Sequence, residues 1–202
     1  DFIMPNKSEI LLKEKYNLKD KIVLLSVGRM NDNKRNYKDL IELSGYLPEN
    51  YNIIVIGPGI TSEQKKELIS SEMIDYLGPI YDNKIINEYY KLSDIFFMPG
   101  CIGLAINHAF YFSKPVIYKK MIGNPPEDFY FKEGCNGYSY QDGGIEDVSK
   151  KIIKLCSNKR LYNSFSSCAQ QTINSEASVE KMYNGFLQAI KYTSTKTLNP
   201  IN

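Results

Sequence analysis

Short apolar segments that end at glycine or proline alternate with segments of helical periodicity along most of this chain. The first, at 21–27, is closed by Gly28, and the second, at 51–56, is closed by Gly57-Pro58-Gly59. Further runs follow at 73–77, 94–98, 115–118 and 137–140. Continuous apolar runs of this length are typical of strands covered on both faces. The alternation therefore predicts βαβ units, a parallel sheet and right-handed crossovers.

The fold class that this pattern predicts is α/β, with a doubly wound parallel sheet of about six strands and helices on both faces. Ser62 is the expected N-cap of the helix that follows the second strand. The segment 104–112 is apolar nearly all round, which predicts the most buried helix. After residue 143 the pattern is helical only, so we expect a helical C-terminal extension that frays from Thr193.

The composition is that of a folded globular protein with no strong bias of charge. The 202 residues are 43% hydrophobic and 24% charged, with a net charge of +2. Nucleic-acid binding usually needs a basic stripe, which is absent here. The longest apolar stretch is interrupted by Pro, Gly, Asn and His, which excludes a transmembrane helix, and the first residues do not form a signal peptide. The pairs Lys119-Lys120 and Lys150-Lys151 either are solvated or make peripheral contact with an anionic membrane.

The cysteines predict neither a metal site nor a disulfide framework. Cys101, Cys135, Cys156 and Cys168 form no C-x-x-C pair, and the chain has a single histidine. A zinc site is therefore not expected. Scattered thiols of this kind predict buried, reduced cysteines in a cytoplasmic protein.

The turn after the first predicted strand carries two cations. Arg29 offers a planar fork of donors, and Lys34, five positions later, offers a mobile point charge. In an open parallel sheet, ligands bind outside the carboxyl ends of the strands. A diphosphate needs compensation at two negative groups, so this pair suits such a ligand. The alternative is an ordinary charged surface loop.

The turn after the fourth run passes through Pro99 and Gly100 into the start of a helix. Glycines at positions 100 and 103 let the backbone approach a ligand closely, and the amides at a helix start attract anions. The alternative is a tight strand–helix turn without a ligand. The only histidine, His108, stands one turn into this helix, where a binding role and a place in the core are both open.

Two further loops carry possible binding groups. Glu127 follows Pro125-Pro126 after the fifth run, where a rigid carboxylate is suited to hold sugar hydroxyls or is a plain surface acid. The turn Gly57-Pro58-Gly59 resembles the start of a dinucleotide fingerprint but lacks its third glycine, so it is a weak indication of a cofactor loop.

Taken in this order, the motifs resemble the C-terminal, donor-binding domain of a GT-B glycosyltransferase of the family-4 type. The resemblance runs from about residue 20 to residue 140. It rests on Gly28-Arg29 with Lys34, the strand 51–56 with Gly57, Leu77-Gly78, Ser93-Asp94 with Pro99, Gly103-Leu104, His108-Ala109, Lys114-Pro115-Val116, Pro126-Glu127, and Gly134 with Gly137.

The resemblance implies a Rossmann-like domain over 21–158, preceded by a linker and short helix at 1–20 and followed by C-terminal helices of the same domain at 159–202. It implies catalytic roles for Arg29, Lys34 and Glu127. Gly78, Pro79 and Ile80 would flank the base, His108 the ribose and Glu127 the sugar. The full nucleotide-sugar site would comprise Gly28, Arg29, Lys34, Gly78, Pro79, Ile80, Gly100, Cys101, Ile102, Gly103, Leu104, His108 and Glu127.

The chain departs from the family in two respects. The family carries a Glu-x7-Glu motif across the fourth strand–helix turn, with the first glutamate reaching the donor sugar and the second holding the ribose, and here those positions are Gly100 and His108. The sugar contact must therefore come from the backbone, from Glu127 or from elsewhere. The enzymes of the family also have two domains of similar size with the active site between them, and only the donor half is matched.

The resemblance implies a nucleotide-diphospho-sugar donor, with UDP or GDP, and retaining, metal-independent transfer of a hexose without a cofactor. The acceptor would be a saccharide or lipid-linked molecule held by an N-terminal domain, in bacterial surface polysaccharide synthesis, in the cytoplasm or at the inner face of the membrane. The alternative is a non-catalytic nucleotide- or partner-binding module on the same fold. A flavodoxin-like regulator would need a phosphoacceptor Asp where Gly28-Arg29 stands.

Overall fold

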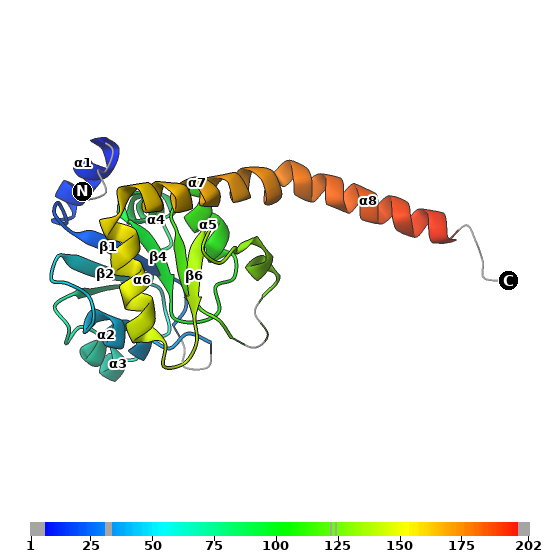
Figure 1. The fold of residues 1–202 in the computed structure, drawn as a ribbon. Coiled ribbons are helices and arrows are strands. Elements are labelled where there is room, and N and C mark those ends of the chain that lie inside the picture. Colours follow the sequence, from blue (N-terminus) through cyan, green and yellow to red (C-terminus); the bar gives the residue numbers. More distant parts are fainter. Residues whose placement is uncertain (1–6, 31–33, 122, 124, 198–202) are drawn as a thin grey trace.

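The computed structural model describes residues 7–30, 34–121, 123 and 125–197. Its sheet contains six parallel strands in the order β3-β2-β1-β4-β5-β6 (Figure 1). The strands are β1 (Ile22–Val27), β2 (Tyr51–Ile56), β3 (Ile74–Gly78), β4 (Ile95–Met98), β5 (Val116–Lys119) and β6 (Gly137–Tyr140). Each predicted run therefore forms a strand, with ends that differ by at most one residue.

Helices connect the strands and follow the last of them. They are α1 (Lys7–Lys15), α2 (Lys38–Ser44), α3 (Ser62–Leu68), α4 (Asn83–Leu92), α5 (Ala105–Tyr111), the 3-10 helix η1 (Pro126–Tyr130), α6 (Ile145–Ser157), α7 (Lys159–Glu176) and α8 (Val179–Thr197). The helical extension after residue 143 is confirmed, and helix α8 continues to Thr197 without the fraying predicted from Thr193. Residues 198–202 lie outside the described residues.

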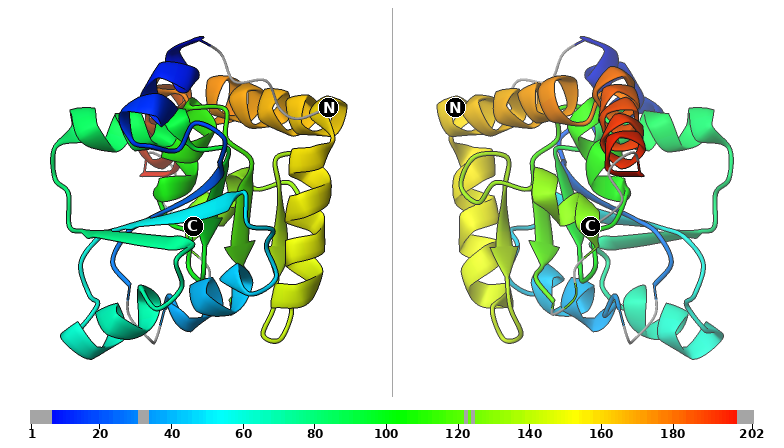
Figure 2. Two further views of the ribbon diagram at one scale, coloured as in Figure 1. Left: turned by 90° about the vertical axis from the view of Figure 1, so that its left-hand side faces the viewer. Right: turned by 90° about the vertical axis from the view of Figure 1, so that its right-hand side faces the viewer.

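The sheet is covered on both faces, as the continuous apolar strands predict. Helices α2, α3 and α6 pack on one face, and α1, α4 and α5 pack on the other (Figure 2). Helix α7 crosses the edge where the strands begin, and it contributes Phe165 to one core and Ala169 to the other. The doubly wound α/β architecture is therefore confirmed.

Two local predictions are wrong. The N-cap of α3 is Thr61, because its hydroxyl accepts the Gln64 amide while the Gln64 side chain accepts the Thr61 amide. This reciprocal pair selects Thr61 over the neighbouring Ser62. Helix α5 is not the most buried helix, since Leu104 and Tyr111 at its two ends are 69% and 68% exposed.

A buried ion pair fixes α1 to the edge where the strands begin. The Lys13 ammonium lies 2.7 Å from the Asp94 carboxylate and also donates to the Lys21 carbonyl. The same carboxylate accepts the Val23 amide at 2.7 Å, and the Asp94 carbonyl accepts the Tyr162 hydroxyl. These bonds join α1, β1, β4 and α7 at one point, so each partner satisfies a group that would otherwise be buried without a bond.

We expect Lys13→Gln to lower the free energy of unfolding by about 3 kcal/mol, because the Asp94 carboxylate stays buried without its cation. Urea unfolding followed by circular dichroism measures this. The matched control is Lys15→Gln on the same helix, whose partner Glu88 is a surface group, and it should change stability little. Equal losses in the two variants would contradict the buried-pair interpretation.

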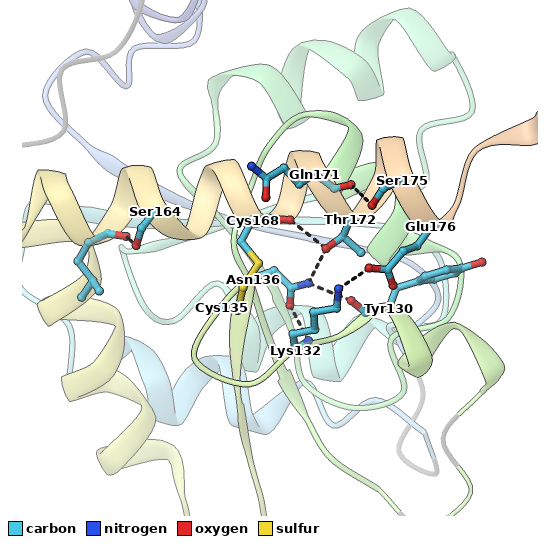
Figure 3. The surroundings of a disulfide bond; sticks show 11 residues. Tyr130, Lys132, Cys135, Asn136, Ser164, Cys168, Gln171, Thr172, Ser175 and Glu176 are labelled. Carbon is cyan, nitrogen blue, oxygen red and sulfur yellow. Dashed lines mark hydrogen bonds and ion pairs between the residues drawn. A yellow bond between two sulfur atoms is a disulfide. The ribbon is translucent and has the colours of Figure 1, made fainter. Parts of the chain in front are cut away.

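The prediction of four reduced cysteines is wrong for Cys135 and Cys168, which form a disulfide (Figure 3). The bond joins the loop before β6 to α7. Sequence spacing gave no sign of it, because the two residues are 33 positions apart and meet only when α7 crosses the sheet edge. Cys156 is free and buried as predicted, and Cys101 is free but only half-buried. The inference from reduced thiols to a cytoplasmic protein does not hold for the bonded pair.

Breaking this disulfide should lower the free energy of unfolding by about 3–4 kcal/mol. The bond restricts the unfolded chain by closing a loop between residues 33 positions apart, and its loss gives the unfolded state more conformational freedom. The measurement is urea unfolding with and without a thiol-free reductant. A Cys135→Ser/Cys168→Ser double variant is the control, because reductant should no longer affect it. A wild-type stability that does not respond to reductant would show that the bond contributes nothing.

Helix α8 projects away from the body of the domain (Figure 1). Its apolar residues recur at helical spacing and are exposed: Val179, Met182, Tyr183, Phe186 and Ile190. Among the described residues, no helix is both long and apolar enough to span a bilayer. An exposed stripe of this kind is typical of a surface that another protein segment covers.

Candidate functional site

The candidate site lies at the carboxyl ends of β1 and β4. These strands are neighbours in the sheet although five other elements separate them along the chain, because the strand order reverses here. Ligands of doubly wound sheets bind at such a switch point. The turn after Val27 and the turn after Met98 therefore lie side by side, as the sequence predicts.

Backbone pairing joins these two turns directly. Arg35 forms an isolated antiparallel bridge with Gly100, the Cys101 amide donates to the Lys34 carbonyl at 2.9 Å, and the Asn36 amide donates to the Pro99 carbonyl at 2.8 Å. Gly100 has φ +153°, and a β-carbon there would lie 1.9 Å from the Lys34 carbonyl oxygen. No side chain fits at position 100, and the close approach that this glycine permits is to backbone.

A third turn, after β2, packs against the first. A β-carbon at Gly57 would lie 2.0 Å from the Gly28 carbonyl oxygen, and the Met30 amide donates to the Pro58 carbonyl at 2.9 Å. A β-carbon at Gly59 would lie 3.2 Å from Cγ of Arg29. The Gly57-Pro58-Gly59 turn therefore serves tight packing of the loops, with the stem of Arg29 lying against it.

Arg35 is the residue that the sequence reasoning missed. Its Nε donates to the Cys101 carbonyl at 2.9 Å, and its Nη1 donates to the Arg29 carbonyl at 3.2 Å. A β-carbon at Gly28 would lie 2.5 Å from Nη1, and one at Gly103 would lie 3.9 Å from Nη2. The guanidinium thus fills the space between two glycines and bonds both turns. Burial lowers the pKa of Arg35 from its usual value.

The only sequence feature that pointed to a role for Arg35 in the site was its position next to Lys34. Its inward direction follows from the backbone bridge with Gly100, which no periodicity reveals. Through it, the turn that carries Arg29 and the turn that carries Gly103 meet at one edge. The structure therefore brings together the two backbone segments of the predicted diphosphate site.

The start of α5 presents free amides at this edge. Within the described residues, the amides of Gly103, Leu104 and Ala105 donate to no partner. Free amides at this point are suited to accept an anion. Ile102 is fully buried, so only its backbone can face a ligand, whereas Cys101 is half-buried.

His108 lies on the exposed face of α5, so the core position, one of the two that the sequence left open, is excluded. Its ring centroid is 5.2 Å from that of Tyr90, which is itself buried. The histidine lines a hollow of about 710 Å³ together with Leu104, Tyr111 and the junction of α7 and α8. The imidazole is therefore accessible for a hydrogen bond with a ligand.

The predicted base-flanking residues lie at the end of β3, at the same edge. Gly78 accepts the Gly57 amide at 2.9 Å, and the Tyr76 hydroxyl donates to the Gly57 carbonyl. The side chain of Ile80 packs against the core beneath α4 and α5. These contacts fix the turn at Gly78, Pro79 and Ile80 next to the turn after β2.

Glu127 is half-buried on η1, and its neighbours hold that short helix in place. The Tyr118 hydroxyl of β5 donates to the Asp128 carboxylate. On the other side, the Asn136 amide group donates to the Tyr130 carbonyl at 2.9 Å and to the Thr172 hydroxyl at 3.3 Å (Figure 3). The disulfide adds a covalent tie next to these bonds. The loop of Glu127 is thus anchored to β5 and α7.

A larger hollow, of about 840 Å³, adjoins Lys34 on the side of β5 and β6. The described residues contain no group of three or more His, Cys, Asp and Glu side chains placed to hold a metal ion. The chemistry that the edge offers is therefore cationic side chains and backbone amides.

A doubly wound parallel sheet with cationic and glycine-rich turns at its switch point is the fold of the C-terminal domain of GT-B glycosyltransferases. The family model described as glycosyl transferases group 1 matches residues 8–172. The chain therefore belongs to this family of glycosyltransferases.

Solved structures show the same fold. HepE of Anabaena, crystallised with UDP-glucose, superposes with a TM-score of 0.77 at 17% identity over 95% of this chain and 54% of that chain. The C-terminal domain of LpcC, a glycosyl transferase group 1 family protein from Francisella tularensis, gives a TM-score of 0.72 at 20% identity over 88% of this chain and 97% of that one. The match to nearly all of an isolated C-terminal domain agrees with the placement that the sequence predicts.

A relative by sequence is the sulfoquinovosyl transferase SQD2 of Arabidopsis thaliana. It is 28% identical over 142 residues, which cover 67% of this chain and 27% of that protein. The chain thus spans about half of HepE and about a quarter of this plant relative.

We expect Arg35→Met to lower the free energy of unfolding by roughly 1–3 kcal/mol, because the carbonyls of Arg29 and Cys101 lose their donor while the apolar stem is kept. Amide hydrogen exchange at residues 100–104 should accelerate as well. Arg160→Met, an exposed arginine at the start of α7, is the control and should leave both measurements unchanged. Unchanged exchange at 100–104 in the Arg35 variant would contradict its bridging role.

Proposed function

We propose that this chain is the donor-binding half of a glycosyltransferase that uses a nucleotide-diphospho-sugar. The observation that carries the proposal is that Arg35 joins the backbone at Arg29 to the turn whose free amides begin α5. A diphosphate is a leaving group whose charge grows as the glycosidic bond breaks, so fixed cations and amides stabilise it most in the transition state. This supports transfer without a metal ion.

The remaining assignments follow the geometry of the edge. Arg29 and Lys34 bind the diphosphate together with the backbone of residues Gly100 to Leu104. His108 binds the ribose, because it is exposed on α5 beyond the free amides. The Gly78–Ile80 turn lies beside the base, and the anchored Glu127 binds the transferred hexose. The donor that we propose carries UDP or GDP; HepE, which shares the fold, was crystallised with UDP and with UDP-glucose.

The acceptor side belongs to a second domain. We propose that a saccharide or lipid-linked acceptor is held by an N-terminal half that also covers α8, and that transfer retains the anomeric configuration. Synthesis of a bacterial surface polysaccharide in the cytoplasm, with peripheral contact at the inner face of the membrane, remains the predicted setting.

One observation favours the alternative of a binding module without turnover. Position 100 has no room for any side chain, so the carboxylate that the family places there has no substitute at that position. Joining this chain to its N-terminal half and measuring sugar transfer separates the two functions. Turnover would exclude the module, whereas donor binding without turnover would support it.

Isothermal titration of the 202-residue chain with UDP and with GDP tests the donor site. Arg29→Ala combined with Lys34→Ala should weaken binding of the preferred nucleotide roughly 100-fold, because two charge-assisted contacts with phosphate are lost. Lys159→Ala removes a charge from the opposite edge of the sheet and should bind like the wild type. An affinity unchanged by the double substitution would contradict the proposal that Arg29 and Lys34 bind the diphosphate.

A further inference from the structure

The hollow of about 840 Å³ beside Lys34 contains charges that the diphosphate does not explain. It opens over the carboxyl ends of β4, β5 and β6. Four of its lining residues are basic and one is acidic: Lys34, Arg35, Asn36, Pro99, Lys119, Lys120, Met121, Gln141 and Asp142. The excess of cations sits at the end of the donor site farthest from the Gly78 turn.

Two described carboxylates near this hollow, those of Asp39 and Asp142, form ion pairs with Lys119. The Lys119 ammonium lies 3.1 Å from Asp39 and 2.5 Å from Asp142. Asp39, which is buried, also accepts the Tyr140 hydroxyl at 3.0 Å and the Asn36 amide group at 2.9 Å. One lysine and two acids thus form a hydrogen-bonded group that shapes the wall, with Asp39 buried and Asp142 exposed.

Lys120 is different. Its amide is fixed to the Tyr140 carbonyl at 2.8 Å, so the residue has a defined place at the end of β5. Its side chain is exposed, and it forms no ion pair with any carboxylate in the described part of the chain. A cation at the rim of a hollow whose described lining is more basic than acidic attracts a negative group from a ligand.

The rest of the lining suits a carbohydrate. Gln141 and the exposed side of Asp142 offer hydrogen-bond acceptors and donors for hydroxyl groups, which a simple phosphate would not require. The sugar of a nucleotide-diphospho-sugar is bonded to the phosphate that Lys34 is proposed to bind. Since Lys34 also lines the hollow, the sugar would extend from the diphosphate across Pro99 toward Lys120, and Glu127, which does not line the hollow, would contact the sugar from outside it.

We propose that this hollow is the subsite for the carboxylate of a nucleotide-linked uronic acid, with Lys120 as the residue that distinguishes it from a neutral hexose. The inference rests on the proposed donor function and narrows its substrate class. Lys120 binds the carboxylate, and the hydrogen-bonded group around Lys119 holds the end of β5 in the geometry that this requires.

The test is the ratio of two affinities, measured by titration of the full 202-residue chain with UDP-glucose and with UDP-glucuronate. The wild type should bind UDP-glucuronate about tenfold more tightly, which is the effect of one charge-assisted contact. Lys120→Gln should bring the ratio to about one, and higher salt should reduce it in the wild type. Lys159→Gln, the same change at the opposite edge of the sheet, should keep the wild-type ratio.

The outcomes separate the two proposals. If UDP binds but the two sugar nucleotides bind equally to the wild type, the uronic-acid subsite is overturned while the donor site stands. A preference that survives Lys120→Gln also overturns the subsite, because Lys120 is then not its cause. If neither UDP nor GDP binds, the donor function fails and this inference fails with it; if only GDP binds, the donor site stands and the UDP-glucuronate subsite is overturned.

Discussion

The backbone pairing of Arg35 with Gly100 is the contact on which this edge of the sheet depends. It joins the ends of β1 and β4, and it works only because position 100 lacks a side chain. The same geometry recurs at Gly28 and Gly57, which also have strongly positive φ values where β1 and β2 end. At each position the space of a β-carbon is filled by a carbonyl or by the Arg35 guanidinium. The surface of the site is thus formed by three turns packed backbone to backbone.

Charge is distributed differently at the two edges of the sheet. Where the strands begin, the buried Lys13 is paired with Asp94 and satisfied by several hydrogen bonds, so this buried cation is compensated. Where the strands end, Arg29 and Arg35 form no ion pair with a described carboxylate. Because Arg35 is also partly withdrawn from water, an anion gains more there than it would beside a solvated surface cation. At the edge of the proposed donor site, a partly buried cation therefore stands without an acidic partner among the described residues.

The sequence was sufficient to predict the strands and the helices between them, which depend on local pattern. The six strands were predictable because most are continuous apolar runs closed by a turn residue. Their parallel direction followed from the helices expected between them. The cap at Thr61 needed the reciprocal bond with Gln64, which distinguishes it from Ser62. The Cys135–Cys168 disulfide and the inward direction of Arg35 depend on segments that meet only in three dimensions. Local periodicity contains no information on contacts between segments that are distant in the sequence.

Helix α5 connects the proposed ribose site with the exposed apolar surface of α8. Its inner face, with Ile106, Ala109 and Phe110, is buried, which an apolar sequence predicts. Its outer face places Leu104, His108 and Tyr111 in the hollow that Val179 also lines. Since Val179 begins the exposed apolar stripe of α8, the uncovered apolar surface is continuous from the proposed ribose site to the projecting helix. A second domain that covered α8 would bury this surface and bring its own residues next to His108. Closure over the donor and burial of α8 would then be one event, because they involve the same surface.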